Sequence, residues 1–255
     1  MRLTKQHSAI LEALDERKRA TAADLAARLG AVEELVREDL GVLEGSGLVH
    51  RSRDEARILV ASPPANRKAQ AAKARIAHAA LGCVEDGDTL FLDSGTTVTL
   101  FAEHLASRKN LTVITNSPPV LAGLGPRVDT KVVLIGGEYS AADRCCVGAL
   151  TERYLERIFV SKVIMGADSI DAESGGVFAR VRHFGYIQAI VRNAKRTILL
   201  AESGKFNRIR GLKILDLDHI DTIVTDAELP ETAREALGRC GVSLLIAGQT
   251  TGRNT

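Results

Sequence analysis

The segment TLFLDSGTTVTLFAEHL, residues 89 to 105, contains the residue types that bind phosphate. Its apolar start, 89–92, predicts a buried strand, a small polar turn follows, and the two threonines after the turn predict the cap and first turn of an amphipathic helix. The unpaired N–H groups and positive dipole end of such a helix attract anions, and hydroxyl side chains donate to phosphate oxygens. An ordinary capped turn is the alternative. The candidate phosphate-binding residues are Asp93, Ser94, Gly95, Thr96 and Thr97.

Polar residues also follow the later predicted strands. Ligands of open α/β sheets bind outside the carboxyl ends of the strands, so these residues are further candidates. Amide and carboxylate groups could pair with sugar hydroxyls, glycines admit close backbone approach, and a lysine offers a cation to a phosphate. Each residue alone is better explained by the tip of a polar loop, but their joint placement favours a ligand site. They are Asn116, Gly136, Gly137, Glu138, Asp168 and Lys205.

The elements that would position these residues alternate along the chain after residue 70. The sequence predicts helices at 71–81, 97–106, 118–124, 147–157, 183–195 and 230–239. It predicts strands at 89–92, 111–115, 131–135, 161–166, 197–201, 221–225 and 242–246. Strands that alternate with helices indicate an α/β fold with a mainly parallel sheet.

The first fifty residues show helical periodicity in three successive segments. Thr21 and Asp24 form a capping-box pattern at the start of the second, and Gly30 predicts its end. The tight connection to the third segment is typical of a helix-turn-helix, which places its second helix in the major groove of DNA. Residues 48–52 and 56–60 predict the two strands of a wing.

The proline-rich composition of one short segment indicates the domain limits. Residues 61–70, ASPPANRKAQ, are typical of a linker, so we expect a winged helix-turn-helix domain at 1–60, a linker at 61–70 and an α/β sensor domain at 71–250.

No apolar run approaches the roughly 18 residues of a membrane span, and no signal peptide is present, so we expect a cytoplasmic protein without membrane association. The four cysteines have no metal-ligand spacing, and we expect no metal and no cofactor.

Six segments after the linker resemble signature segments of the DeoR family of bacterial transcriptional regulators, in order and at matching spacing. They are GDTLFLDSGTT (87–97), LTVITNS (111–117), LIGGE (134–138), GADSID (166–171), ESGKF (202–206) and DTIVTD (221–226). The resemblance covers nearly the whole chain. It implies a sensor domain related to ribose-5-phosphate isomerase, with a phosphorylated sugar or similar metabolite held at the candidate residues above. Lys73 occupies the position of a lysine that usually opens the family's first sensor helix.

The chain departs from the family pattern in the helix meant to contact DNA. The family usually has a serine, a threonine and two consecutive arginines where this chain has Val32, Leu35, Arg37 and Glu38, and Arg53-Asp54-Glu55 replaces His-Gly-Gly in the wing. Residues 1–60 contain ten Lys plus Arg against eleven Asp plus Glu, whereas DNA-binding domains are typically basic. We therefore expect weak or unusual DNA binding. The candidate contact residues are Arg37, Glu38, His50, Arg51, Arg53 and Arg57.

A second departure lies at the predicted helix 183–195. The family commonly has acidic residues and a lysine there, and this chain has His183-Phe184-Gly185 and Gln188, so the ligand or the response to it could differ.

These observations favour a transcriptional regulator, a repressor of a carbohydrate operon that a phosphorylated sugar controls. Its expected partners are a double-stranded DNA operator, the sugar phosphate and further copies of itself, as a dimer or tetramer, because one winged domain contacts too few bases for a specific operator. An isomerase-like enzyme is one alternative, but 173–176 lack the Lys-Gly-Gly-Gly element of sugar-phosphate isomerases. A regulator that acts through protein partners is the other.

Overall fold

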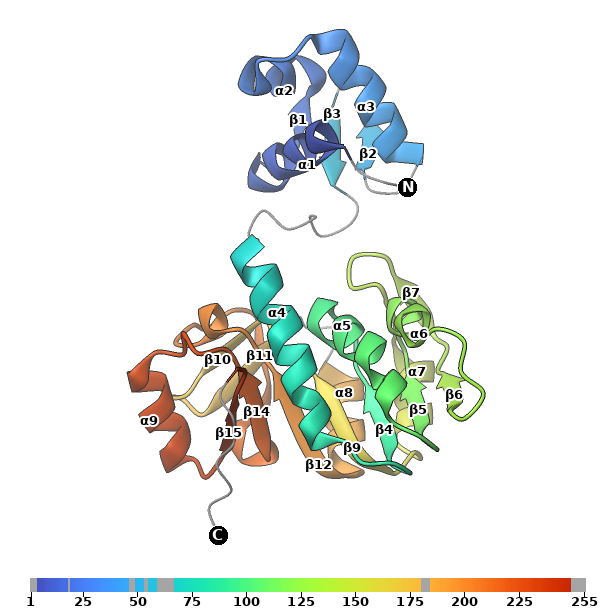
Figure 1. Cartoon of the computed structure of the whole chain (residues 1–255), viewed down its shortest axis with the longest axis vertical. Coiled ribbons are helices and arrows are strands. Elements are labelled where there is room, and N and C mark those ends of the chain that lie inside the picture. Colours follow the sequence, from blue (N-terminus) through green and yellow to red (C-terminus); the bar gives the residue numbers. More distant parts are fainter. Residues whose placement is uncertain are drawn as a thin grey trace. The chain divides into compact units, whose positions relative to one another are not determined.

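The computed structural model of the chain divides into two compact units, Met1–Arg67 and Lys68–Thr255 (Figure 1). It describes residues 4–17, 19–45, 49–52, 55–58, 67–179 and 184–248. Arg53, His183 and residues 61–66 of the predicted linker lie outside the described residues.

The N-terminal unit combines helices with a small antiparallel sheet. Its elements are α1 (Lys5–Arg17), β1 (Ala20–Thr21), α2 (Ala22–Leu29), α3 (Glu33–Gly45), β2 (Val49–Ser52) and β3 (Glu55–Ile58). Within the described residues the sheet has the order β1-β3-β2. The helices and the β2–β3 hairpin agree with the periodicity of the sequence. The strand β1 was not predicted, because two residues are too short to show a period.

Local sequence explains where α2 begins and ends. The Thr21 hydroxyl accepts a hydrogen bond from the Asp24 N–H at 3.0 Å, and the Asp24 carboxylate accepts one from the Thr21 N–H at 3.3 Å, which is the predicted capping box. Gly30 ends the helix in the left-handed conformation, with φ of 61°. The buried His7 of α1 pairs through Nε2 with Asp39 Oδ1 at 2.9 Å and so ties α1 to α3.

The C-terminal unit is built on a parallel sheet of seven strands within the described residues, in the order β15-β14-β12-β9-β4-β5-β6. Neighbouring strands of this sheet pair in parallel throughout the described residues. The strands are β4 (Thr89–Leu92), β5 (Thr112–Thr115), β6 (Lys131–Leu134), β9 (Val160–Met165), β12 (Ala194–Leu200), β14 (Thr222–Thr225) and β15 (Ser243–Ile246). The predicted α/β class with a mainly parallel sheet is confirmed.

Helices cover both faces of this sheet (Figure 1). They are α4 (Arg67–Ala79), α5 (Thr96–His104), α6 (Pro118–Leu124), α7 (Ala149–Leu155), α8 (Phe184–Arg192) and α9 (Glu231–Arg239). Side chains alternate along a strand, so Leu90 and Leu92 join the core beneath α4, α5 and α6, while Phe91 joins the core beneath α7, α8 and α9. Burial on both faces explains why these strands are continuous apolar runs.

Several sequence predictions in this unit were wrong in detail. Helix α4 begins at Arg67 rather than at 71. Residue 147, predicted to start a helix, ends the strand 145–147, and residues 194–195 begin β12 instead of extending α8. The missed strands form small antiparallel pairings. They are β7 (Glu138–Ser140) with β8 (Cys145–Val147), and β10 (Ser169–Asp171) with β11 (Gly176–Ala179) and β13 (Leu212–Asp216).

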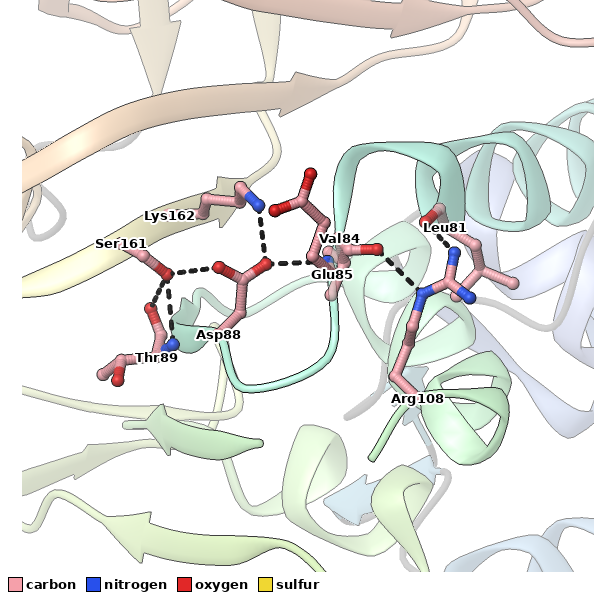
Figure 2. Close-up of polar contacts among 8 residues, drawn as sticks. All are labelled: Leu81, Val84, Glu85, Asp88, Thr89, Arg108, Ser161 and Lys162. Carbon is pink, nitrogen blue, oxygen red and sulfur yellow. Dashed lines mark hydrogen bonds and ion pairs between the residues drawn. The ribbon is translucent and has the colours of Figure 1, made fainter. Parts of the chain in front are cut away.

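The amino ends of β4 and β9 are tied together by Asp88, as Figure 2 shows. The Asp88 carboxylate accepts hydrogen bonds from Lys162 Nζ at 2.6 Å, from the Ser161 hydroxyl at 2.8 Å and from the Glu85 N–H at 2.8 Å. Burial raises the pKa of Asp88, but the bonds from Glu85, Lys162 and Ser161 outweigh burial and hold the pKa below its ordinary value. Nearby, the Arg108 guanidinium donates to the carbonyls of Val84 and Leu81.

We predict that Asp88→Asn lowers the free energy of unfolding by about 3 kcal/mol, because Lys162 keeps its charge in a largely buried position and loses its partner. The contribution of a carboxylate with a depressed pKa is complete above the ordinary pKa, about 4, and is lost as the pH falls through the folded-state value. Urea denaturation should show a constant difference from wild type near neutrality and a shrinking one in acid.

Asp86→Asn is the matched control, since Asp86 is exposed and accepts one hydrogen bond, from the Lys109 N–H at 2.9 Å. Equal losses in the two variants, or a difference independent of pH, would contradict the role given to Asp88.

Candidate functional site

The order of the parallel strands reverses between β4 and β9. From β4 the chain steps through β5 to β6 on one side, and from β9 it steps through β12, β14 and β15 on the other. The loops that follow β4 and β9 therefore leave the sheet in opposite directions and open a crevice at their carboxyl ends, where open α/β sheets bind ligands. The segments 93–97 and 166–168 directly follow the two strands on either side of this reversal.

The loop after β4 ends in an uncapped helix start. Gly95 is the N-cap residue of α5, with φ of 121° and no side-chain hydrogen bond to the helix, so the cap is Gly95 and not Thr96 as predicted. Such a φ is strained for residues other than glycine. Gly95 and Thr96 are exposed, whereas Ser94 and Thr97 are buried. Gly95 thus supplies no side-chain acceptor to the first N–H groups of α5, and helix starts of this kind bind anions.

Asp93 is the buried residue that supports this loop. Its side chain is only 3% exposed, and Oδ1 accepts a hydrogen bond from the Tyr186 hydroxyl of α8 at 2.8 Å. The adjacent Cys145 thiol is buried, and burial together with the negative charge of Asp93 raises its pKa to about 12, which keeps it unreactive. Burial likewise raises the pKa of Tyr186. Asp93 therefore holds the loop after β4 in place through its hydrogen bond with Tyr186 of α8.

Asn116 follows β5 and is fully buried. Its Nδ2 donates to the Cys146 carbonyl at 2.8 Å, and its backbone carbonyl accepts from the Cys146 N–H at 2.8 Å. Its Oδ1 has no hydrogen-bond partner among the described residues. A buried acceptor without a partner is costly, so a hydroxyl donor from a ligand would be stabilised there.

The loop after β6 is shaped by packing. A Cβ on Gly137 would lie 2.0 Å from the Thr151 hydroxyl oxygen and 2.8 Å from the Val147 carbonyl oxygen, whereas a Cβ on Gly136 would meet no atom within 4 Å. The Thr151 hydroxyl donates to the Gly136 carbonyl at 3.0 Å. Glu138 is exposed at the start of β7. Gly137 is thus required for packing on α7, and Gly136 leaves open space.

Charged residues gather beyond β9 and β12. Lys205 Nζ donates to the carbonyl of Ala167, in the loop after β9. Burial lowers the pKa of Lys205, Glu202 and Asp168 oppose that shift, and Lys73 adds to it. Lys73 Nζ of α4 lies 3.8 Å from Glu202 Oε1, and Glu202 Oε2 is buried without a partner in the described part of the chain.

The structure brings the loop residues 93–97, Asn116, Asp168 and Lys205 to the carboxyl edge of neighbouring strands, as the sequence predicts. Sequence reasoning missed Tyr186, Thr151 and the orphaned oxygen of Glu202. No spacing rule could have found Tyr186, because it approaches Asp93 from a helix 93 positions along the chain.

Five of the six candidate DNA-contact residues lie within the described residues, two on α3 and three in the β2–β3 hairpin. Arg37 is exposed and its Nη2 pairs with Glu33 Oε1 at 2.5 Å, while Glu38 is exposed. His50 is exposed on β2, and the Arg51 N–H donates to Glu44 Oε1 at 2.8 Å. Arg57 is placed only as the backbone partner of His50 in β3.

Comparison with known proteins identifies the chain. A family model described as the DeoR C-terminal sensor domain matches residues 68–227. The glycerol-3-phosphate regulon repressor of Escherichia coli K12 is 26% identical over 93% of this chain and 96% of its own length. The HTH-type transcriptional repressor GlcR of Bacillus subtilis is 28% identical over 96% of this chain and 97% of its own. Ribose 5-phosphate isomerase A from Neisseria gonorrhoeae aligns with 52% of each chain at a TM-score of 0.39 and 18% identity.

These matches define the protein as a transcriptional regulator, and the sequence prediction of a regulator rather than an enzyme is confirmed. The chain belongs to the DeoR family.

No described helix is long and apolar enough to cross a membrane. Among the same residues, Asp216, Asp218 and His219 bring three possible metal-ligand atoms within 4.8 Å of one another, and all three are exposed. Exposed acidic groups of this kind commonly occur without a metal, and Lys213 pairs with Asp216.

We predict that Gly137→Ala lowers the free energy of unfolding by about 3 kcal/mol, because the new methyl group overlaps Thr151 and a backbone carbonyl that cannot move cheaply. Gly136→Ala is the control, since its methyl group enters open space. Thermal and urea unfolding of both variants would check this. Similar stability of the two would show that the packing on α7 does not constrain this loop.

Proposed function

We propose that this regulator binds a phosphorylated sugar in the crevice between the β4 and β9 loops and that binding releases it from an operator of a carbohydrate operon. The observation that carries the proposal is the uncapped start of α5 at Gly95, next to the only reversal of strand order in the described sheet. The names of the relatives support it, because one of them is a repressor of the glycerol-3-phosphate regulon.

Different residues bind the phosphate and the sugar hydroxyls of the ligand. The phosphate lies at the start of α5, where backbone N–H groups and the exposed Thr96 hydroxyl donate to its oxygens. The sugar hydroxyls donate to the orphaned Asn116 Oδ1 and Glu202 Oε2. Lys205 supplies a nearby cation, and an anion beside it favours its charged form. Gly136, Glu138 and Asp168 form the exposed rim.

We predict that phosphorylated sugars raise the melting temperature and that the corresponding free sugars do not. At a hundredfold excess over Kd a ligand adds about 2.7 kcal/mol to the stability of the folded state. Thr96→Val, which removes one exposed hydroxyl, should reduce the shift caused by the phosphorylated sugars and leave the unliganded melting temperature near that of wild type. Differential scanning fluorimetry with paired phosphorylated and free sugars measures both effects.

Thr99→Val is the matched control, because the Thr99 hydroxyl lies one turn further along α5 and donates to the Gly95 carbonyl at 2.9 Å. Equal shifts with phosphorylated and free sugars, or equal losses in the two variants, would remove the phosphate from the start of α5.

Helix α4 connects the sensor to the N-terminal unit through the chain. It begins at Arg67, where the two units divide, and its Lys73 reaches Glu202 at the carboxyl end of β12. A bound phosphate attracts Lys73, so ligand binding competes with the pairing of Lys73 with Glu202 Oε1. The position of α4 then depends on whether the site is filled, which is the differential contact that allosteric coupling requires.

We predict that Lys73→Gln uncouples the two functions. Sugar phosphate should still raise the melting temperature, but the ratio of DNA affinities without and with the ligand should fall from the roughly 5–150-fold range of typical allosteric coupling toward one. Fluorescence anisotropy of labelled operator DNA, titrated with and without ligand, measures this ratio.

Lys68→Gln is the control on the same helix, since Lys68 pairs with Glu228 at 3.0 Å and both side chains are largely exposed. An unchanged ratio in Lys73→Gln, or the same loss in Lys68→Gln, would exclude this route of coupling.

The N-terminal unit is proposed to bind DNA as a winged helix-turn-helix, with α3 in the major groove and the β2–β3 hairpin as the wing. Arg37, Glu38, His50, Arg51, Arg53 and Arg57 are the proposed contacts. Assembly into a dimer or tetramer completes the proposal, because two half-sites give a specific operator.

A further inference from the structure

The outward face of α3 has an unusual composition for a helix that enters DNA. Val36, Leu40 and Leu43 are buried in the core of the N-terminal unit. Residues two positions away from a buried residue lie nearly half a turn round the helix, which places Glu34, Glu38, Gly41 and Val42 on the opposite side. Glu34 and Glu38 are one turn apart and both are exposed. The middle of the outward face therefore carries two glutamates, with Val42 beside them on the side of Leu35.

The two flanks of this face differ from each other. Leu35 and Val42 form one flank, and they are 50% and 45% exposed. Glu33 and Arg37 form the other and pair at 2.5 Å, which fixes the Arg37 guanidinium at the edge of the helix. The Arg51 guanidinium lies beside Gly41, since a Cβ there would be 3.7 Å from Nη1. Cations thus border the face from the side of Arg37, and apolar side chains border it from the other.

A carboxylate is selective among the base edges of the major groove. Cytosine presents the N4 amino donor, guanine presents two acceptors, thymine presents the O4 acceptor, and adenine presents a donor beside the N7 acceptor. An acceptor-only group is repelled by guanine and thymine and is better matched to cytosine than to adenine. Exposed leucine and valine side chains match the C5 methyl group of thymine. The face therefore suits a strand that combines cytosines with thymines.

We propose that Glu34 and Glu38 determine operator specificity by accepting hydrogen bonds from cytosine N4 groups, with Leu35 and Val42 against thymine methyl groups on the same strand. The proposal rests on the DNA-binding function proposed above and deepens it. Arg37, His50 and Arg51 supply the attraction to phosphates that the glutamates do not.

The test is selection of DNA sequences from a random library by the full-length chain and by Glu38→Gln. Glutamine is isosteric, and its amide pairs with adenine N6 and N7. The wild type should select half-sites that contain cytosine within a pyrimidine-rich strand. In Glu38→Gln the preference at one cytosine position should shift to adenine by on the order of tenfold. Replacing thymine by uracil in the selected site should weaken binding by wild type, because the methyl groups are lost.

Glu55→Gln serves as the control, because Glu55 is an exposed residue of β3 that lies 3.8 Å from Arg19 and is not on α3. It removes the same charge and should leave base preferences unchanged. If Glu38→Gln binds every sequence more tightly with unchanged preferences, the glutamates only repel phosphates and the inference is overturned. If wild type selects no sequence while the sugar-phosphate shift persists, the DNA-binding function itself fails, and an acidic protein-docking helix replaces it.

Discussion

The reversal of strand order between β4 and β9 is the constraint on which the rest of the sensor depends. Parallel pairing brings the ends of successive strands to one edge, and the reversal separates the loops that follow β4 and β9. The same two strands are locked at their amino ends, where Asp88 accepts bonds from Lys162 and Ser161 of β9 (Figure 2). Rigid pairing at one end allows polar, partly unsatisfied groups to be held at the other, because the sheet and not the ligand fixes their spacing.

Much of this arrangement could be predicted from the sequence, and the reasons are physical. Strands buried on both faces are apolar runs with short polar loops after them, so β4, β5 and their terminal residues Asp93 and Asn116 were found at the right positions. The strands β7, β8, β10, β11 and β13 were not found, because short antiparallel pairs depend on tertiary partners more than on local period. The roles of individual residues could not be predicted from the sequence either.

Asp93 and Gly137 show why such roles were hidden. Both stand in segments with the composition of a ligand-binding loop. Asp93 is held by Tyr186 from a distant helix, and Gly137 is fixed by the space that Thr151 occupies. Lys73, which the family resemblance singled out, meets Glu202 from an element far away in the sequence, and no local pattern indicates that contact. A sequence indicates which loops meet at a sheet edge. Which side chains of a loop support the fold and which remain available to a ligand depends on contacts with side chains from distant parts of the chain.

Opposing charges within the chain explain how both proposed sites could be selective. In the sensor, Glu202 and Asp168 lie beside Lys205 and Lys73, so a bare anion has to displace an internal partner and gains little. A ligand that also donates hydroxyls to the orphaned oxygens of Asn116 and Glu202 offsets that cost. On α3, the exposed glutamates weaken attraction to phosphates, which is the main source of non-specific DNA binding. Because specificity is a difference between affinities, this loss is common to all sequences and cancels, so selectivity on α3 comes from the base contacts proposed for the glutamates.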